Sequence, residues 1–563
     1  MKYTRLGDLL VDAGVISQDQ LDTALAQQKE SKKRLGEQLI DSGAISERQL
    51  IGALTRQLGI EFIDLTTTEI APEMTQYVSK NIAKKYSVVP VQTRGDELYL
   101  AMVDPLNFIA SEEVKAASRK RVVPMIATAA AMEHAISELY GTEGAKRAIR
   151  EMQQESEEDA AFATGAAVAR VEDPQAAPSI RLVDTIIERG IADRVSDIHI
   201  EPREDDMRVR MRIDGILHDD LAIPKELQQS VTARIKIMCG MDVTERRVPQ
   251  DGRTLMQVKG KEIDIRSSTL PTVHGEKIML RLLDREAQES TPEGLGFSGE
   301  NLEKFNALLS NRAGVILLVG PTGSGKSSTM FSMLNQLNTE AVNIVTLEDP
   351  VEYKIEGINQ VQVNEKTGMT FASGLRSILR QDPDIIAVGE IRDSETADIA
   401  MRAAVTGHLV LSTVHTSDAL STIDRLHDLG VAPYMVSTAL KGIISQRLLR
   451  RVCPHCKHSY TPTAEELAML GMTEEEGAGV EFYRGSGCSE CFGSGYRGRI
   501  AAAEILVVDD KIRSAIHTRA SLDDMIQAVE ESGFVPILSN CRDLVLAGIT
   551  TVDEAYRTIN TTD

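Results

Sequence analysis

Between residues 291 and 445, short runs of apolar residues alternate with segments that have the periodicity of an amphipathic helix. The runs Val315–Val319, Ile344–Leu347 and Ile385–Val388 have the length of buried strands, and Ser328–Leu337 has a helical pattern. Short apolar runs separated by helical segments are typical of a parallel sheet that is covered on both faces. The pattern therefore predicts an α/β domain built around a parallel sheet.

The segments on either side of this domain have other patterns. Val88–Val91 and Leu98–Val103 read as strands of a small α/β module, whereas residues 180–192 read as a helix that precedes strands at 196–201 and 207–213. Polar and charged residues with little to bury indicate a linker between them. We therefore expect the following parts: a repeat subdomain (1–60), a second N-terminal α/β subdomain (61–141), a charged linker (142–179), an arm (180–290), the α/β domain (291–445), a cysteine-bearing element (446–505) and a helical C-terminal region (506–563).

The first 57 residues contain an internal repeat. Arg5–Gln28 returns 29 positions later as Arg34–Gln57, and 13 of the 24 positions are identical. Each copy reads as two short helices, the first of which ends at Gly14 in the first copy, because glycine accepts the left-handed conformation that follows a helix. Ser17 and Gln20 predict a capping box at the start of the second helix. Two copies are too few for a solenoid, so a pseudo-symmetric pair is the better interpretation.

Composition narrows the class of protein. The 563 residues carry 62 Lys and Arg against 84 Asp and Glu, a net charge of −22, which disfavours binding to nucleic acid. The N-terminus lacks the pattern of a secretory signal, and the apolar runs are too short to span a membrane. We therefore expect a cytoplasmic protein, and any association with a membrane would come through a partner. Six cysteines are too few for a disulfide framework.

The segment Gly320–Ser327 fits the pattern GxxxxGK[ST] between a buried strand and a helix. In this context, called a P-loop, glycines let backbone N–H groups wrap phosphates at a helix N-terminus. Lys326 is expected to contact the β- and γ-phosphates of ATP, and Ser327 a Mg²⁺ ion. The alternative is a chance glycine-rich turn. The candidate ATP-binding residues are Gly320, Pro321, Thr322, Gly323, Ser324, Gly325, Lys326, Ser327 and Ser328.

Two further apolar strands end near acids. Ile385–Val388 leads to Glu390, and a carboxylate in such a position commonly holds the metal or its water. Ile344–Leu347 leads to Glu348, which could activate the attacking water. The alternative for the second strand is an ordinary surface turn at Asp349–Pro350.

Two other groups of residues admit both a structural and a functional interpretation. Arg208–Gly215 alternates charged with apolar residues, which by default indicates a half-exposed strand. One of its arginines, Arg210 in our preferred assignment, could instead stabilise charge at the γ-phosphate. His408 and His415 flank an apolar strand, and from the residues alone they are equally well histidines at the edge of a core.

These motifs, in this order, resemble the ATPases of type II secretion and type IV pilus assembly (the GspE/PilB group). Val345–Glu352 resembles their acidic box and Thr406–Thr416 their histidine box, and the resemblance runs from about residue 180 to the C-terminus. It implies a multidomain α/β protein with a RecA-like P-loop ATPase core, a PAS-like arm and a zinc-binding insertion, assembled as a homohexamer. It also implies a membrane platform protein as partner, and extension rather than retraction.

The resemblance assigns roles to single residues. Glu348 would be the catalytic carboxylate, Glu390 the acid on the Mg²⁺ side, and His415 a sensor near the γ-phosphate. The arm would supply arginines across a subunit boundary, with Arg210 as one of them. The family's second arginine appears here as Lys225, which keeps the charge but loses the bidentate geometry.

Four of the cysteines form two CxxC pairs, Cys453 with Cys456 and Cys488 with Cys491, with 31 residues between the pairs. Four thiolates at this spacing suit tetrahedral Zn²⁺ in a structural role, and redox pairs or disulfides are the alternatives. Cys239 and Cys541 are most simply small buried hydrophobic residues.

The N-terminal repeat resembles the MshEN domain, an α-helical plus α/β domain that binds cyclic di-GMP. That resemblance implies a regulatory site in which pseudo-symmetric arginines grip two phosphates. A plain helical domain that docks a protein is the alternative, with the leucines as core. The implied ligand-binding residues are Arg5, Leu6, Gly7, Leu21, Leu25, Gln28, Arg34, Leu35, Gly36, Leu50, Leu54, Gln57 and, from the following subdomain, Asp104.

The sequence thus predicts an ATP-driven pilus or pseudopilus assembly motor that is controlled by cyclic di-GMP. A nucleic-acid translocase with a P-loop core is the alternative from another class, and the net charge argues against it.

Overall fold

A computed structural model describes residues 178–258, 260–284 and 291–560 continuously, most of residues 60–153, and a few positions before residue 60. The chain divides into two compact units, one formed mainly by residues up to Leu282 and the other mainly by residues from Leu283 onward. Each unit is described by itself below.

The first unit contains a small α/β module around a three-stranded sheet. Strand β2 pairs antiparallel with β1 and parallel with β3, and both strands expected here from the sequence are confirmed. The core closes over the buried Tyr140, whose hydroxyl donates to the backbone oxygen of Val78 at 2.6 Å. The elements are η1 (Pro72–Gln76), α5 (Lys80–Tyr86), β1 (Val88–Arg94), β2 (Glu97–Met102), α6 (Phe108–Ser118) and β3 (Arg121–Ile126).

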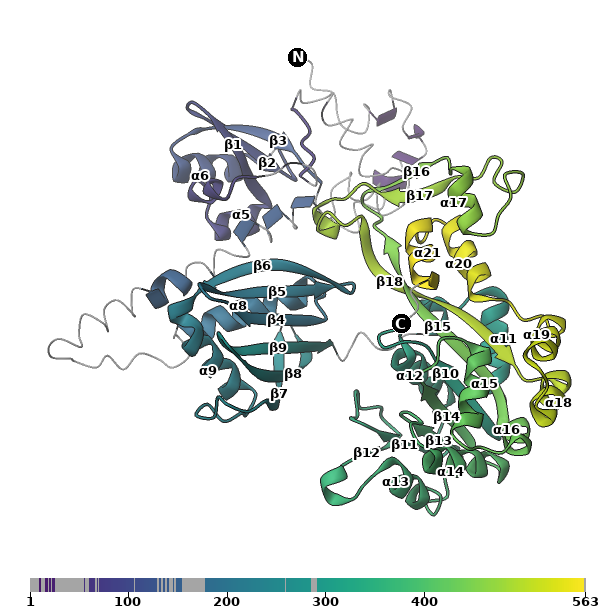
Figure 1. The fold of residues 1–563 in the computed structure, drawn as a ribbon. Coiled ribbons are helices and arrows are strands. Elements are labelled where there is room, and N and C mark those ends of the chain that lie inside the picture. The colour runs from purple at the N-terminus through teal and green to yellow at the C-terminus, as the bar shows by residue number, and fades with distance from the viewer. Residues whose placement is uncertain are drawn as a thin grey trace. The chain divides into compact units, whose positions relative to one another are not determined.

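The arm of the first unit forms a six-stranded sheet with the order β6-β5-β4-β9-β8-β7 (Figure 1). Along β5, Met207, Val209 and Met211 are buried, whereas the arginines between them point to the opposite, more exposed face. The expected helix and the two expected strands are confirmed as α8, β4 and β5. The elements are α8 (Pro178–Ala192), β4 (Asp197–Pro202), β5 (Asp206–Ile213), β6 (Ile216–Pro224), η3 (Lys225–Leu227), α9 (Gln228–Met238), β7 (Gln250–Val258), β8 (Lys261–Thr272) and β9 (Gly275–Asp284).

The second unit is built on a seven-stranded sheet with the order β12-β11-β13-β14-β10-β15-β18. The strands from β12 to β15 run parallel, as the sequence predicts, and β18 alone pairs antiparallel, along β15. The strands are β10 (Gly314–Val319), β11 (Ile344–Glu348), β12 (Asn359–Gln362), β13 (Ile385–Val388), β14 (Leu409–Val414), β15 (Leu440–Val452) and β18 (Tyr496–Val507).

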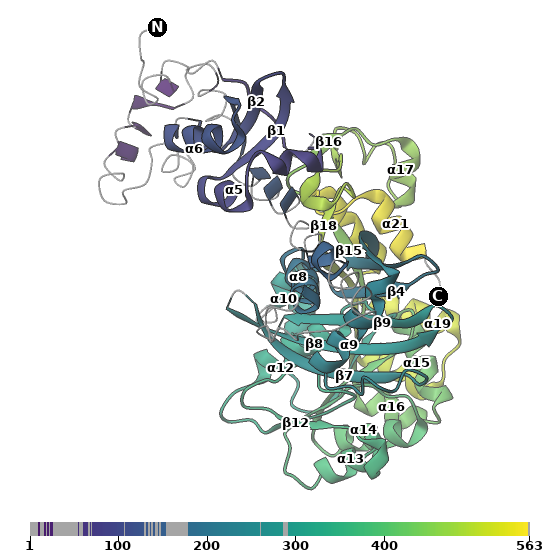
Figure 2. The same cartoon turned by 90° about the vertical axis from the view of Figure 1, so that its left-hand side faces the viewer.

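Helices of the second unit cover this sheet, and α13, α14 and α16 lie next to one another beside it (Figure 2). Because central strands such as β10 and β14 are buried on both faces, they read in the sequence as continuous apolar runs. The helices are α10 (Pro292–Leu295), α11 (Gly299–Leu309), α12 (Lys326–Leu337), η5 (Glu365–Thr367), α13 (Phe371–Ile378), α14 (Ser394–Val405), α15 (Ala419–Asp428) and α16 (Pro433–Ala439).

Strand β15 leads directly into the first cysteine pair, and the returning strand β18 follows the second. Between them stand β16 (Lys457–Tyr460), α17 (Ala464–Met469), β17 (Phe482–Gly485) and η6 (Ser489–Cys491). The expected helical tail is confirmed as α18 (Asp510–Thr518), α19 (Leu522–Glu531), α20 (Ile537–Leu546) and α21 (Val552–Asn560).

Strand β18 lies at the edge of the sheet, where no further strand of the described chain pairs with it. Side chains bond its backbone groups on that open side instead. The Asn301 amide donates to the backbone oxygen of Ala503 at 2.9 Å, and the backbone N–H of Ala503 donates to Asn540 Oδ1 at 3.0 Å. Both asparagines are buried, so the edge is closed to other strands at this point.

None of the described helices combines the length and the apolar character that crossing a bilayer requires.

Candidate functional site: a P-loop with two strand-end acids

The P-loop lies between the end of β10 and the start of α12, which begins at Lys326, two residues earlier than the sequence pattern indicates. Gly325 caps the helix with a φ of 91°, a left-handed conformation that favours glycine. Lys326 is buried, and its Nζ donates to the backbone oxygens of Gly320 at 2.6 Å and Pro321 at 3.0 Å. Its ammonium group therefore lies inside the loop that would receive a phosphate.

The loop offers groups that fit a phosphate. Backbone N–H groups at the start of the 12-residue helix α12 and the charge of Lys326 both favour an anion. Within the described part of the chain, the buried Ser324 Oγ has no hydrogen-bond partner. Burial lowers the pKa of Lys326, and the nearby Glu390 carboxylate partly opposes that shift. Glu390 balances only part of the positive charge of Lys326, and a bound triphosphate would supply the remaining negative charge.

Glu348 is the last residue of β11 and is only 8% exposed. Its carboxylate accepts hydrogen bonds from Thr346 Oγ1 at 2.6 Å and from the Gln360 side chain at 2.9 Å. The Gln360 amide also donates to the backbone oxygen of Tyr353 at 2.7 Å, so its own orientation is fixed. These two donors are uncharged, so they fix the position of the Glu348 carboxylate and place no positive charge beside it.

Glu390 lies two residues beyond the end of β13, next to Arg392 and His415. One of its oxygens pairs with Arg392, and the other lies 3.2 Å from Nε2 of His415. His415 follows the end of β14 directly, so the ends of two neighbouring strands bring the acid and the histidine together. Together with Lys326, they form one cluster at the carboxyl ends of the strands, where ligands of parallel sheets bind.

The two histidines differ in their surroundings. His408 precedes β14, and its Nδ1 lies 2.8 Å from the backbone oxygen of Ala403, near the end of α14. His408 therefore fits the structural interpretation, that of a histidine at the edge of a core. His415 is half exposed and contacts Glu390, and its expected role near the γ-phosphate stays a prediction.

Arg210 lies on β5 in the first unit, where it pairs with Glu201 at 3.3 Å and Asp219 at 3.3 Å. Lys225, in the position of the second expected arginine, donates to the backbone oxygen of Glu204. Both cations thus have partners within the arm.

The four paired cysteines come together in one cluster, in which one ligand atom from each lies within 4.8 Å of the others. Cys488 Sγ and Cys491 Sγ are 3.6 Å apart, close to the ~3.8 Å between sulfurs that share a tetrahedral Zn²⁺ at ~2.3 Å. Three of the four are buried and Cys456 is half-buried. The donor set fits a closed structural zinc site with no position for a substrate.

The other two cysteines are buried, as expected, and burial raises the pKa of the Cys239 thiol to about 11 and that of Cys541 to about 12.

The N-terminal repeat is described only in part. The expected capping box is present: the N–H of Ser17 donates to Gln20 Oε1 at 2.8 Å, and the N–H of Gln20 donates to Ser17 Oγ at 3.2 Å. Leu21 is buried, whereas Leu25 is 39% exposed. Asp104 lies between β2 and α6. The remaining residues of the expected cyclic di-GMP site lie outside the described residues: Arg5, Leu6, Gly7, Gln28, Arg34, Leu35, Gly36, Leu50, Leu54 and Gln57.

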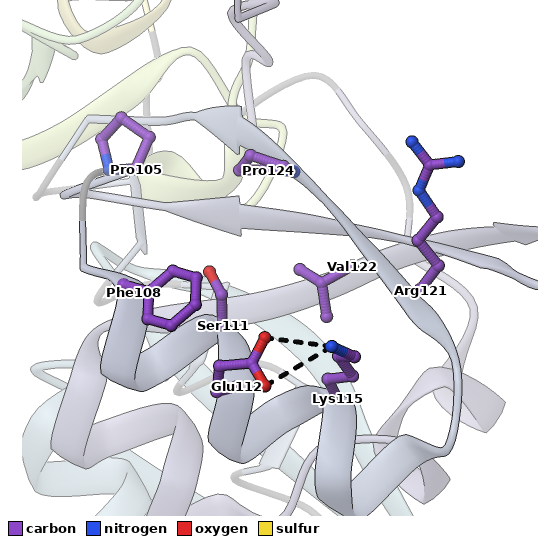
Figure 3. Close-up of a pocket in the computed structure, with 8 residues that line it drawn as sticks. All are labelled: Pro105, Phe108, Ser111, Glu112, Lys115, Arg121, Val122 and Pro124. Carbon is purple, nitrogen blue, oxygen red and sulfur yellow. Dashed lines mark hydrogen bonds and ion pairs between the residues drawn. The ribbon is translucent and has the colours of Figure 1, made fainter.

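A pocket of about 370 Å³ lies between α6 and β3 of the small α/β module (Figure 3). Phe108 and Val122 give it apolar walls, and Lys115 pairs with Glu112 at 3.1 Å at its rim. The lining includes Pro105 but not the preceding residue, Asp104. Leu21, Leu25 and Asp104, the expected ligand-binding residues that the structure describes, do not line this pocket.

Comparison with known proteins identifies the family. The family described as "Type II/IV secretion system protein" matches residues 172–557, and the MshEN domain matches residues 58–146, a range that contains Asp104 but not the doubled motif.

Three relatives illustrate the match. A protein of Myxococcus xanthus named "Type IV pilus assembly ATPase PilB" is 38% identical over 562 residues, 98% of each chain. A protein of Thermus thermophilus with the same name is 43% identical over 512 residues, 89% of this chain but only 56% of that longer relative. The solved structure of the ATPase DotB of Legionella pneumophila shares the fold, with a TM-score of 0.51 at 20% identity over 66% of this chain and 93% of that one. The chain belongs to the type II/IV secretion system protein family, as an ATPase of its pilus-assembly and type II secretion group that carries an MshEN domain.

Proposed function

We propose that this ATPase works as a homohexamer that drives the extension of a type IV pilus or a type II secretion pseudopilus. It would act in the cytoplasm, through a platform protein of the inner membrane. The observation that carries this proposal is the cluster of Lys326, Glu390 and His415 at the carboxyl ends of neighbouring strands. Such a cluster can bind a triphosphate and respond to its hydrolysis.

Each residue of the cluster has a proposed role. Ser327 and Glu390 would hold Mg²⁺, which would neutralise charge on the phosphates. Glu348, held by Thr346 and Gln360, accepts a proton from the attacking water. Arg210 of a neighbouring subunit would stabilise the negative charge at the γ-phosphate. The separate surroundings of Glu348 and Glu390 support this division of roles.

We also propose that cyclic di-GMP controls the motor through the N-terminal region. The support is the doubled Arg-Leu-Gly motif, the MshEN domain that follows it, and the partly exposed Leu25 beside the buried Leu21. Two arginines related by pseudo-symmetry suit a ligand with two equivalent phosphates.

Calorimetry with cyclic di-GMP on the full chain tests the control site. Arg5→Ala and Arg34→Ala should each weaken binding roughly ten-fold or more, because each removes a charge-assisted contact to a phosphate. A wild-type chain that releases no heat would contradict the ligand site and leave protein docking as the role of the repeat.

ATP turnover tests the motor. Membranes that contain the platform protein should stimulate hydrolysis by the wild-type chain, whereas DNA should not. Stimulation by DNA instead would favour a nucleic-acid translocase.

A further inference from the structure

Gln446 is a buried amide that touches the P-loop from a strand more than one hundred residues away. It lies on β15 and is 1% exposed. Its Oε1 accepts from the hydroxyl of Thr329 in α12 at 2.7 Å, and its Nε2 donates to the backbone oxygen of Ser324 at 2.8 Å. One side chain thus bridges the loop and the helix that together would hold a phosphate.

The loop also fits closely around this residue. A Cβ atom at Gly325 would lie only 2.6 Å from Gln446 Nε2, and one at Gly320 would collide with the backbone oxygen of Gln446. Any side chain at either glycine would therefore displace either the loop or Gln446. Gly320 and Gly325 therefore leave room for Gln446 as well as for a phosphate.

The bond to Ser324 determines where the next N–H group points. In a trans peptide unit the C=O and the following N–H point in opposite directions. Because Gln446 holds the Ser324 oxygen on the β15 side, the N–H of Gly325 points away from β15. At the N-cap of α12, that N–H is one of the donors that a phosphate would use.

We propose that Gln446 is a positioning residue, which sets the peptide between Ser324 and Gly325 for phosphate binding before the nucleotide arrives. This rests on the proposed nucleotide site at the P-loop. The amide serves both partners at once, because it offers an acceptor to the Thr329 hydroxyl and a donor to the Ser324 oxygen. Gln446 itself does not touch the nucleotide.

Binding of ADP and steady-state turnover of ATP by the full chain test this role. Gln446→Met keeps the shape but makes neither bond, so ADP should bind roughly ten-fold more weakly and KM for ATP should rise by a similar factor. We expect kcat to change less than about three-fold, because the catalytic groups stay in place. Gln446→Glu should bind still more weakly, because a second oxygen would face the Ser324 carbonyl.

The exposed Gln527, which donates to Glu531 at 3.0 Å, provides the matched control, and Gln527→Met should bind ADP like the wild type. Melting curves identify variants that have not folded. If Gln446→Met does not fold, Thr329→Val, which removes one of the two bonds, should still weaken ADP binding roughly three-fold.

Folded Gln446 variants with wild-type affinity for ADP would overturn the proposal, as would a loss confined to kcat. A wild-type chain that binds no ADP would instead contradict the nucleotide site itself, so the two failures are distinguishable.

Discussion

The two strand-end acids of the site differ in what surrounds them. Neutral donors hold Glu348, whereas Glu390 contacts a guanidinium and an imidazole. Arg392 and His415 lie against different oxygens of Glu390, whereas both donors to Glu348 bond its Oε1. The surroundings therefore favour Glu348 as the base.

Glu348→Gln should lower kcat about 100-fold or more, because the amide cannot accept a proton from water. ADP affinity should change less than about two-fold, since Glu348 is not a phosphate ligand in our assignment. Turnover and calorimetry on the same preparation measure both quantities.

The matched control is Glu356→Gln, an exposed acid on the loop that follows β11, which should leave kcat unchanged. Normal hydrolysis by Glu348→Gln would show that Glu348 is not the catalytic acid.

A third acid, Glu504, is buried in β18, where it accepts from the backbone N–H groups of Ala419 and Ile537, each at 3.1 Å. Burial raises its pKa above the ordinary value, although the two N–H groups partly oppose the shift. The folded state therefore binds this proton more tightly than the unfolded state. The stability contributed by Glu504 is fully present below its unfolded pKa of about 4.3 and is lost as pH rises through the folded pKa.

Glu504→Gln cannot ionise, so it isolates this effect. As pH increases from about 5 to about 8, the free energy of unfolding of the wild type should fall relative to that of the variant. Urea denaturation of both proteins across this range measures the difference. A difference that stays constant, or that grows in favour of the wild type, would mean that the folded pKa is not raised.

At the scale of elements, β18 shows how buried amides close a sheet edge. Asn540→Ala leaves the N–H of Ala503 without its acceptor, which should lower the free energy of unfolding by about 1–3 kcal/mol. Chemical denaturation measures the loss. Asn560→Ala, which removes an exposed amide from α21, should cost less than about 0.5 kcal/mol. Equal effects of the two substitutions would contradict the role of Asn540.

Most elements of the second unit could be predicted from the sequence, because strands buried on both faces leave unbroken apolar runs such as Val315–Val319. The antiparallel direction of β18 could not be predicted from the sequence. Its run resembles the others, and it returns antiparallel because it follows the cysteine element rather than a crossover helix.

The candidate site was predictable where a motif is local in sequence, as in the P-loop. Gln360 and Gln446 were missed because each reaches its partner through the fold, across 12 residues to Glu348 and 122 residues to Ser324. A single glutamine in a strand carries no periodic or spacing signal. Arg392 was missed as well, although its position two residues after Glu390 was a usable signal.

At the scale of the whole molecule, the cysteine cluster joins segments that the chain separates by 31 residues. We expect about one zinc ion per chain, and its removal by a chelator should lower the melting temperature, because structural zinc contributes folding energy. Metal analysis and calorimetric melting measure both. ADP should still bind to the zinc-free chain wherever the P-loop remains folded.

Cys453→Ser should reproduce the loss of zinc, whereas Cys541→Ser, at a buried thiol outside the cluster, should retain the metal. Full zinc content in Cys453→Ser would contradict the site.

Strand β15 carries Gln446 near its middle and ends one residue before Cys453. Seven residues of extended chain span ~23 Å, and β18 pairs with this length of β15 up to Val452. A tilt of this strand by a few degrees about Gln446 would displace its cysteine end by about an ångström or more. A change at the P-loop that tilted β15 would therefore also move the cysteine element, because one strand carries both Gln446 and the residue before Cys453.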